Sequence, residues 1–594
     1  MATEATSTSR ELAPSEKVAS PVRPRNPDQD RHIRGKKRKL KASVLSEGSH
    51  DEVLSADVRA LLTKLDLSEA TGTKKLDQFE QVEVTIDEIS STGDGLGHIE
   101  GSSRIFTVPF TSAGDVVQAK FIREDTNTNV MITDFLSVIK PSPLRDDSLV
   151  KCPYFAKCSG CQFQMLPYPA QLAHKKTIVE KAYRNFSGLP VDLVPAVGDT
   201  IGSPLQYGYR TKLTPHFDGP PGGRRAGRKG ERAYFTEVPP IGFMQKGTRK
   251  TLDIEECPIG TEAVQMGLRR ERKRVVKDLD TYKKGVTILL RESSQRIVKS
   301  ETEATEAVHP KQPGLDEENQ TVYEDRGPYM HAKTCISDPH ATSTEYVEDF
   351  VFENNANSFF QNNNSILPSF TEYIRSQITA PMPTATGEAT TDATPHQFEN
   401  FIDAYSGSGL FTITLSSLFK RSIGIDIDAS GIKSARRNAR LNSLQAPTST
   451  TCSSDHATTT SSTAYASTAP TVAFIAATAS ELFSSVSSWS PAQTVVVCDP
   501  PRKGCDESFL RQLLAFGPAR IVYVSCNVHT QARDIGFLLR DCKGPALGEG
   551  VGKGEVLAGT EAAMYEIETV RGFDFFPQTG HVESVATLRR KSLT

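Results

Sequence analysis

The segment FENFIDAYSGSGLFTITLSSLF, residues Phe398–Phe419, constrains the fold more than any other part of the chain. Its pattern predicts a buried strand, a tight turn at Gly407 and Gly409, and then a helix. A second apolar strand pattern, SIGIDID, follows and ends at about Asp426. Glycines let the backbone approach a ligand, and an acid at the end of the second strand accepts hydrogen bonds from ribose hydroxyls. The segment therefore predicts an open α/β sheet that binds a nucleoside.

The glycine turn departs from the dinucleotide pattern G-x-G-x-x-G, because its third glycine position is occupied by Thr412. The sequence also offers no clear cradle for a pyrophosphate. S-adenosylmethionine needs the same acid for its ribose, but its sulfonium needs no anion site. We therefore expect S-adenosylmethionine as the ligand, and the alternative is a glycine turn in an ordinary α/β domain.

Two further apolar runs end in residues that can carry chemistry. VVVCDPPRKG, Val495–Gly504, ends a strand pattern with Asp499, and the two prolines after it hold the backbone rigid. IVYVSCNVHTQARDI, Ile521–Ile535, places Cys526 at the end of a short buried strand. Ligands bind outside the carboxyl ends of parallel strands, so both residues are candidates for one pocket. The competing interpretation of Cys526 is a small core residue, because free cysteines are usually buried.

A third reactive candidate lies near the C-terminus. The segment GFDFFPQTGHVESVATLRR predicts a turn and a final strand that contain Glu583. Apolar and aromatic neighbours raise the pKa of a carboxyl group, which makes it a usable base near neutral pH. The competing interpretation is an exposed glutamate on a strand.

Four cysteines are candidates for a metal site. KCPYFAKCSGCQFQM contains Cys152, Cys158 and Cys161 in a C-x5-C-x2-C spacing, which forms a partial thiolate cage that needs one more ligand. Cys257 of DIEECPIG, next to a proline, is the candidate for that ligand. Thiolates suit either a structural zinc ion or an iron-sulfur cluster, so the residues alone leave the metal open.

Two regions have features of RNA binding. Residues Gln78–Pro141 form short alternating runs around a glycine turn at Gly93–Gly97, which predicts a small β-barrel. Beyond the first three cysteines the chain carries a Gly/Pro/Arg loop, GPPGGRRAGRKGER, that is suited to phosphate contacts or is a surface loop with incidental charge. A strip that could stack on and hold single-stranded RNA consists of Tyr207, Tyr209, Arg210 and Lys212.

Composition limits the cellular context. The chain has 594 residues and a net charge of only -3, so any nucleic-acid surface must be local. The tract RHIRGKKRKLK, Arg31–Lys41, indicates a nuclear localisation signal, an RNA-phosphate patch or a solvated charge run. No apolar run approaches the roughly 18 residues of a membrane span. The lack of an apolar secretory segment predicts a reducing compartment. We expect the nucleus or the cytoplasm, with the mitochondrion as a further candidate.

Taken together, the blocks DAYSGSG, CDPPRKG, VSCN and FPQTGHVE, in this order, closely resemble the signature of the RNA 5-methyluridine methyltransferase family. The resemblance spans roughly Gln78–Arg590 and includes a barrel that is similar to the TRAM domain. It implies an α/β fold with a Rossmann-like S-adenosylmethionine-dependent methyltransferase domain, an N-terminal TRAM-like β-barrel and a central α+β domain.

The resemblance also implies roles for individual residues. Cys526 matches the family nucleophile that adds to C6 of uracil, and Glu583 matches the base that removes the C5 proton. The chain departs from many relatives at Leu410, where they carry a polar amide. The cysteine pattern resembles the [4Fe-4S] set of the bacterial ribosomal branch, with a structural zinc as the alternative. The implied cofactor contacts are Gln361 of SFFQNN, Tyr405, Asp426, which replaces the commoner glutamate, and Asp499.

By resemblance, we expect the chain to be a monomeric tRNA (uracil-5-)-methyltransferase that acts on the T-loop uridine, position 54. The uridine must be flipped out of its stack to reach the pocket. The alternatives are an RNA-binding or tRNA chaperone scaffold without activity, and a methyltransferase that acts on ribosomal RNA or on another base.

The domain boundaries that we expect follow from these regions. Residues 1–77 are predicted to be a disordered basic arm, and residues 78–141 the RNA-binding TRAM-like barrel. Residues 142–345 are predicted to form the central domain with the cysteine cluster and inserted loops, one of them at residues 300–327. Residues 346–594 are predicted to form the Rossmann-like methyltransferase domain, interrupted by low-complexity inserts.

Overall fold

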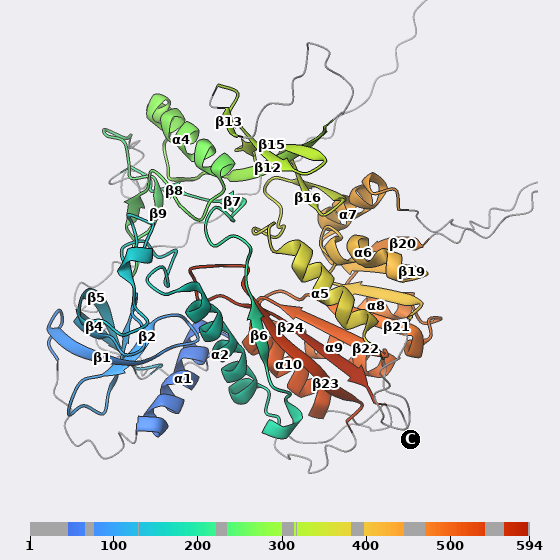
Figure 1. Ribbon diagram of the computed structural model, residues 1–594, viewed down its shortest axis with the longest axis horizontal. Helices are drawn as coiled ribbons and strands as arrows, with labels where there is room; N and C mark the ends of the chain where they lie inside the picture. Colours follow the sequence, from blue (N-terminus) through green and yellow to red (C-terminus); the bar gives the residue numbers. More distant parts are fainter. Residues whose placement is uncertain are drawn as a thin grey trace, which may run out of the picture. The chain divides into compact units, whose positions relative to one another are not determined.

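The computed structural model describes residues 45–65, 76–128, 130–220, 234–299, 314–316, 318–381, 397–444, 470–540 and 563–591 (Figure 1). The tract Arg31–Lys41, most of the Gly/Pro/Arg loop and most of the low-complexity inserts lie outside these ranges. Within the ranges, no helix combines the length and apolar character that crossing a membrane requires.

The N-terminal region forms the predicted β-barrel. Its strands close in the order β1-β2-β3-β5-β4. In β1, exposed and buried residues alternate from Gln81 to Ile86, because successive side chains of a strand point to opposite faces. The five strands are β1 (Gln81–Ile89), β2 (Gly95–His98), β3 (Ile105–Val108), β4 (Val116–Asp125) and β5 (Val130–Lys140).

Helix α1, His50–Leu65, corrects our prediction of disorder for this part of residues 1–77. The Ser49 hydroxyl accepts a hydrogen bond from the amide of Glu52 at 3.3 Å, which caps the start of the helix. Apolar residues then recur at helical spacing among the charged ones, and each one that is fully buried contributes about 1.5–3 kcal/mol. The apolar residues that pack against Leu96, Ile105 and Val130 of the barrel are Leu54, Val58 and Leu61.

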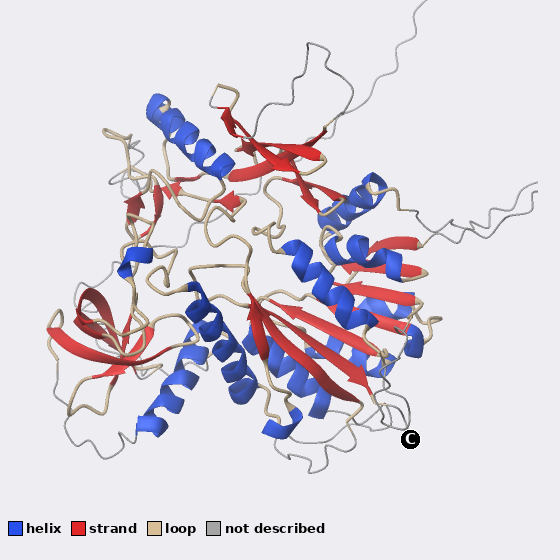
Figure 2. Cartoon of the chain, in the orientation of Figure 1, coloured by secondary structure: helices blue, strands red, loops and turns tan. Residues whose placement is uncertain are grey.

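The central region contains two small antiparallel sheets (Figure 2). One has the order β10-β9-β8-β11 and the other β13-β14-β15-β12-β7. The elements are α2 (Tyr168–Phe186), β6 (Gly198–Ile201), β7 (Lys212–Leu213), β8 (His216–Phe217), β9 (Gly242–Met244), β10 (Thr251–Asp253), α4 (Glu262–Lys277), β11 (Val286–Thr287), β12 (Leu290–Val298), β13 (Gly314–Asp316), β14 (Thr321–Arg326) and β15 (Tyr329–Ile336).

Strands β13 and β14 lie where we predicted an inserted loop, residues 300–327, so that prediction is wrong for its second half. The acidic composition had indicated a loop, but the charges are paired across strands. Val322 of β14 is the partner of Lys333 on β15, and Lys333 donates a hydrogen bond to Glu324 at 2.8 Å. Cross-strand pairs of opposite charge stabilise a sheet despite its polar sequence.

The C-terminal region is built on an eight-stranded sheet with the order β20-β19-β18-β21-β22-β24-β23-β6, which confirms the α/β fold class (Figure 1). The five neighbouring strands β20, β19, β18, β21 and β22 are parallel to one another, and β24 runs antiparallel to β22. The elements are β16 (Thr342–Val347), β17 (Phe350–Asn355), α5 (Leu367–Thr379), β18 (Asn400–Ala404), α6 (Leu410–Leu415), β19 (Arg421–Asp426), α7 (Ala429–Leu441), β20 (Thr471–Ala476), α8 (Ala479–Ser485), β21 (Thr494–Cys498), α9 (Glu507–Phe516), β22 (Arg520–Ser525), α10 (Val528–Arg540), β23 (Tyr565–Phe573) and β24 (Glu583–Arg590).

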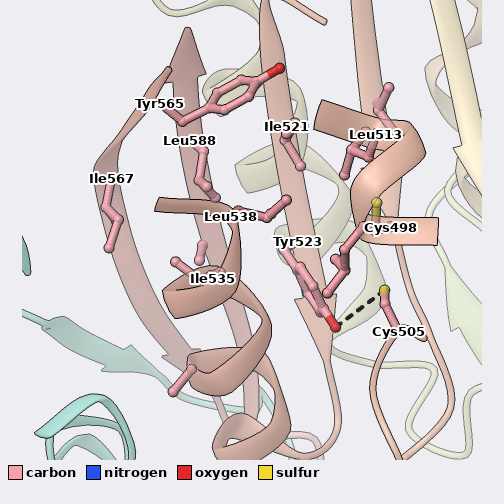
Figure 3. Close-up of a cluster of buried hydrophobic side chains, with 14 of the residues drawn as sticks. Cys498, Cys505, Leu513, Ile521, Tyr523, Ile535, Leu538, Tyr565, Ile567 and Leu588 are labelled. Carbon is pink, nitrogen blue, oxygen red and sulfur yellow. Dashed lines mark hydrogen bonds between the residues drawn. The ribbon is translucent and has the colours of Figure 1, made fainter. Parts of the chain in front are cut away.

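Helices cover both faces of this sheet. On one face, α10 packs Ile535 and Leu538 against Ile521, Tyr523 and other residues of the strands (Figure 3). The same cluster includes residues of α2, α8 and α9. On the other face, α5, α6 and α7 form a second apolar cluster with the strands. Both α2 and β6 come from the range predicted to be the central domain, yet they complete the layers of the C-terminal sheet.

Candidate active site

The predicted nucleophile and base lie at neighbouring strand ends. Strand β22 ends at Ser525, whose Cα partner on the antiparallel strand β24 is Ser584. Cys526 therefore follows β22 beside Glu583, the first residue of β24. The charge of Glu583 is one of the causes that raise the pKa of Cys526, so the two side chains act on each other. The register of one strand pair brings together residues that are far apart in the sequence.

Several charges act on the half-buried thiol of Cys526. Burial raises its pKa to about 12, and the carboxylates of Glu583 and Asp499 contribute to the increase. The guanidinium group of Arg502 opposes it through its charge and a hydrogen bond. A thiol with a raised pKa is protonated at neutral pH, so its reactivity depends on how these charges are balanced.

Glu583 is almost fully buried, with 3% of the residue's surface exposed. The competing interpretation of an exposed strand glutamate is therefore wrong. Burial raises the pKa of Glu583 well above its usual value, the charge of Asp499 adds to the effect, and Arg502 opposes it. A carboxylate with a raised pKa binds a proton more strongly, which is what a general base requires.

Three acids gather at the carboxyl ends of β18, β19 and β21. Burial raises the pKa of Asp499, and the charges of Asp403 and Asp426 raise it further. Asp426 accepts a hydrogen bond from the amide of Gly407 at 2.9 Å. Asp403, which sequence reasoning missed, accepts bonds from the amide and the hydroxyl of Thr412 at 2.9 and 2.6 Å. Thr412, which occupies the third glycine position of the dinucleotide pattern, thus binds the start of α6 to β18.

The glycine turn has the backbone that a close ligand contact requires. Gly407 and Gly409 have φ values of 53° and 94°, and Tyr405 also has a positive φ of 67°. A side chain at Gly407 would meet no atom within 4 Å, so open space lies beside it. The ring of Tyr405 packs against that of Phe509, with the centroids 5.5 Å apart.

Gln361 lies on a different segment from the glycine turn. It is 9% exposed and belongs to the stretch between β17 and α5. The next two residues join this stretch to other parts of the chain, because the carbonyl of Asn362 accepts a bond from the amide of Thr211 and Asn363 donates to the carbonyl of Phe575. None of the hydrogen bonds between described residues joins Gln361 to Tyr405 or Asp426.

Cys526 lines a pocket of about 500 Å³. One wall is the segment Gly580–Val582, which precedes Glu583, and another is the barrel turn at Ser91 and Thr92. A third wall is the N-terminal segment Ser46–Val53. A pocket of this size is large enough for a nucleoside base and is bounded by parts of the chain from all three regions.

Sequence reasoning missed the N-terminal wall. Asn527 donates a hydrogen bond to the carbonyl of Gly48 at 3.1 Å, and Glu47 forms an ion pair with Arg533 at 2.7 Å. A Cβ at Gly48 would lie 2.4 Å from the Thr530 side chain, so the segment lies directly on the start of α10. The signal that could have found it is the S-x-x-E motif before the apolar residues of α1.

The four predicted metal ligands line one other pocket, of about 310 Å³. Burial raises the pKa of Cys257 to about 12, and the charges of neighbouring cysteines contribute to this increase. In the described ranges, however, no group of three or more His, Cys, Asp or Glu residues is arranged to hold a metal ion. The structure thus brings together Cys152, Cys158, Cys161 and Cys257 but leaves the prediction of a metal untested.

Known proteins resemble the chain over most of its length. Residues 343–542 match the family model tRNA (Uracil-5-)-methyltransferase. A tRNA (uracil(54)-C(5))-methyltransferase of Schizosaccharomyces pombe is 40% identical over 93% of this chain and 86% of its own length. The chain belongs to the tRNA (uracil-5-)-methyltransferase family. This membership confirms the predicted family and the prediction of a methyltransferase.

A second yeast relative agrees with the family assignment, and a solved structure agrees with the fold. The tRNA (uracil(54)-C(5))-methyltransferase of Saccharomyces cerevisiae is 36% identical over 91% of this chain and 78% of its own length. The crystal structure of Pyrococcus abyssi tRNA (uracil-54, C5)-methyltransferase with S-adenosyl-L-homocysteine covers 85% of this chain and 100% of its own, with a TM-score of 0.51. At 21% identity, this likeness supports the family's fold.

Proposed function

We propose that the chain transfers a methyl group to C5 of uridine 54 in transfer RNA, with S-adenosylmethionine as the methyl donor. The observation that carries this proposal is the position of Cys526 beside Glu583, which results from the pairing of β22 with β24. The two yeast relatives support the choice of RNA and of position, because both are tRNA (uracil(54)-C(5))-methyltransferases.

Cys526 is proposed to activate the uracil ring, because C5 alone is too weak a nucleophile to accept a methyl group. The thiol of Cys526 first gives its proton to water. The thiolate then bonds to C6, and the electrons of the C5=C6 bond move towards C5 and the C4 carbonyl oxygen. S-adenosylmethionine, when bound, supplies the methyl group to C5. The pocket beside Cys526 receives the flipped base.

Glu583 is proposed to remove the C5 proton after methyl transfer. The electrons of that C–H bond re-form the C5=C6 double bond, while the bond between C6 and the sulfur of Cys526 breaks and returns the thiolate. Burial of Glu583 suits this step, since a carboxylate with a raised pKa is a stronger base.

The glycine turn and its acids fit S-adenosylmethionine. Each carboxylate oxygen of Asp426 accepts one backbone amide, from Gly407 and Asp428, which leaves lone pairs for ribose hydroxyls. The space beside Gly407 is open to a ligand. We also propose, as the family resemblance implies, that Asp499, Tyr405 and Gln361 contact the cofactor.

The four-cysteine pocket is proposed to hold a [4Fe-4S] cluster. The support for this proposal is that Cys152, Cys158, Cys161 and Cys257 line one pocket, as the thiolate ligands of a single group do. A structural zinc ion, which takes the same ligands, is the alternative. Anaerobically purified protein should contain iron and sulfide and should lose both in Cys161→Ser. Stoichiometric zinc in place of iron would contradict the cluster.

The test of the proposed function uses the full-length chain, S-adenosylmethionine and an unmodified tRNA transcript. Mass spectrometry should find 5-methyluridine at position 54, and a transcript with cytidine at that position should remain unmethylated. A transcript with 5-fluorouridine should form a covalent adduct with the protein, but not with Cys526→Ala. Tight RNA binding without methylation would instead support an inactive RNA-binding or chaperone scaffold.

The remaining expectations are proposals of the same kind. We propose that the protein acts as a monomer in the nucleus or the cytoplasm, with the mitochondrion as a further candidate. Imaging of the tagged full-length chain with and without charge-neutralising changes in Arg31–Lys41 tests whether this tract directs nuclear import.

A further inference from the structure

One glutamine joins three parts of the molecule at the wall of the catalytic pocket. The side-chain oxygen of Gln162 accepts a hydrogen bond from the amide of Gly580 at 2.9 Å. Its side-chain nitrogen donates to the carbonyl of Thr92 in the barrel turn at 2.9 Å. Its backbone amide donates to the carbonyl of Gln578 at 2.7 Å. We call these three hydrogen bonds the Gln162 bridge.

The bridge holds the loop 574–582, which connects β23 to β24 and therefore ends at Glu583. This loop separates two pockets. On one side, Gly580 and Val582 line the pocket that contains Cys526, which we call the catalytic pocket. On the other side, Phe576 and Thr579 line the pocket of the four cysteines. His581 lines both pockets. A displacement of the loop would therefore change the catalytic pocket and the start of the strand that carries Glu583.

Other contacts hold the first half of the loop. Lys175 of α2 forms a buried ion pair with Asp574 and also donates to the carbonyl of Phe576. Gln171 and Gln578 exchange two hydrogen bonds of 3.0 Å. These contacts all lie on the far side of Thr579 from Glu583.

In the second half of the loop, one hydrogen bond to Gln162 holds the backbone. Among the hydrogen bonds of the described residues, the one from the amide of Gly580 to Gln162 is the one that ties residues 580–582 to another part of the chain. Val582 is in addition buried in the apolar cluster of the sheet. Gln162 therefore supplies the polar anchor of residues 580–582, and apolar packing supplies the other.

The fit around the bridge is tight. A Cβ at Gly93 would lie 2.2 Å from the side-chain nitrogen of Gln162, and a Cβ at Gly580 would lie 3.2 Å from the Cα of Gly93. The barrel turn, the cysteine segment and the loop thus meet without space for another side chain. Gln162 directly follows Cys161, so a shift of the cysteine segment would also move the side chain that binds the loop.

We propose that Gln162 is a positioning residue that aligns Glu583 with the C5 proton of the methylated uracil. This inference rests on the proposed function, because it concerns the proton-removal step of that reaction. Formation of the bond between Cys526 and C6 does not use the Glu583 carboxylate as a base. Loss of the bridge should therefore slow proton removal more than it slows attack by the thiolate.

The test replaces Gln162 with methionine, which keeps the size of the side chain and removes both of its hydrogen bonds. We expect kcat to fall by about 10-fold to 100-fold, as a small misplacement of a catalytic group does. We also expect a primary kinetic isotope effect with 5-deuterated uridine in the tRNA, because proton removal becomes rate-limiting. A purely structural role for Gln162 would not produce this isotope effect.

A matched control is Gln377→Met. The side-chain oxygen of Gln377 accepts hydrogen bonds from Thr569 and Thr587, so it holds the same two strands at a distance from Glu583. Like the unchanged protein, this variant should show no primary isotope effect. Gly580→Ala provides a second perturbation, because its Cβ would push the loop away from Gly93, and it should show the same isotope effect as Gln162→Met.

The outcomes separate this inference from the proposed function. An isotope effect in Gln162→Met and in Gly580→Ala, but not in Gln377→Met, supports the inference. Full activity of Gln162→Met without an isotope effect overturns it, and if that variant does not fold, the result with Gly580→Ala decides. If the unchanged protein forms no 5-methyluridine at all, the proposed function itself fails, whatever the variants show.

Discussion

At the scale of single residues, the chemistry depends on how a few charges act on one sulfur. Burial and two carboxylates raise the pKa of Cys526 to about 12, and Arg502 opposes them. The thiolate is therefore the minor form at neutral pH in the free protein. Protonation or removal of either carboxylate favours the thiolate, because it removes a negative charge from the neighbourhood of the sulfur.

Replacement of Arg502 by methionine should make Cys526 less reactive. The change removes the cation that lowers the thiol pKa, so the pH profile of alkylation by iodoacetamide should move to higher pH. At a fixed pH near neutrality, alkylation should slow by about tenfold for each unit of that shift. The control Arg511→Met removes an exposed arginine that pairs with Glu507 on α9 and should leave the profile unchanged. An unaltered profile in Arg502→Met would show that its charge does not act on the sulfur.

Replacement of Glu583 by glutamine should have the opposite effect on the thiol. It removes a negative charge that raises the pKa of Cys526, so the alkylation profile should move to lower pH. The variant also lacks the proposed base, so a covalent complex between the protein and methylated tRNA should accumulate. Denaturing gel electrophoresis with labelled, unsubstituted tRNA measures this complex. Normal turnover by Glu583→Gln would contradict the assigned base.

At the scale of elements, the N-terminal segment adds a wall to a pocket that the C-terminal sheet provides. Helix α1 packs on the barrel, and the residues before it lie on the start of α10 beside Cys526. The buried carboxylate of Asp57 accepts a hydrogen bond from the amide of Ser91 at 2.5 Å, which joins the helix to the barrel turn in the same pocket. We expect this wall to contribute to RNA binding rather than to the chemical step.

Replacement of Gly48 by valine should displace this wall. Gly48 has a φ of 65°, and a side chain there would collide with Thr530. The KM for tRNA should rise by about tenfold, equivalent to about 1.4 kcal/mol, while kcat changes less because the pair of Cys526 and Glu583 is held by the sheet. The control is Gly101→Ala, since Gly101 has a φ of 75° but no atom within 4 Å of an added Cβ. Equal KM values for the two variants would count against the wall.

At the scale of the whole molecule, buried polar contacts connect helix α2 to the loop 574–582, which ends at Glu583. Lys175 on α2 and Asp574 on the loop form a buried ion pair, and burial lowers the pKa of Lys175. An ion pair of this kind contributes little net stability, but removal of one partner leaves an uncompensated buried charge.

The variant Lys175→Met should therefore lose about 3–5 kcal/mol of unfolding free energy. The double variant with Asp574→Asn should recover part of this loss, because no charge then remains buried. Chemical denaturation of the two variants and the unchanged protein measures the difference. If the double variant is no more stable than Lys175→Met, the buried charge is not the cause of the loss.

The local patterns of the sequence were sufficient for the parallel strands β18, β19, β21 and β22 and for the residues at their ends. Apolar runs followed by Asp426, Asp499 and Cys526 were visible because a buried parallel strand leaves a continuous apolar signature and its ligand-facing end is polar. The barrel was visible for a related reason, because alternation of buried and exposed residues marks strands with one solvated face.

The sequence alone did not determine which distant segments meet. The pairing of Ser525 with Ser584, the contact of Gly48 with Asn527 and the Gln162 bridge each join residues far apart in the chain. Such contacts leave no periodic trace, because the partner of a hydrogen bond across the fold does not alter the local pattern of either segment. The reactive side chains were therefore determined by the sequence, whereas the register of antiparallel strands and the packing of the loops decided that they share one pocket.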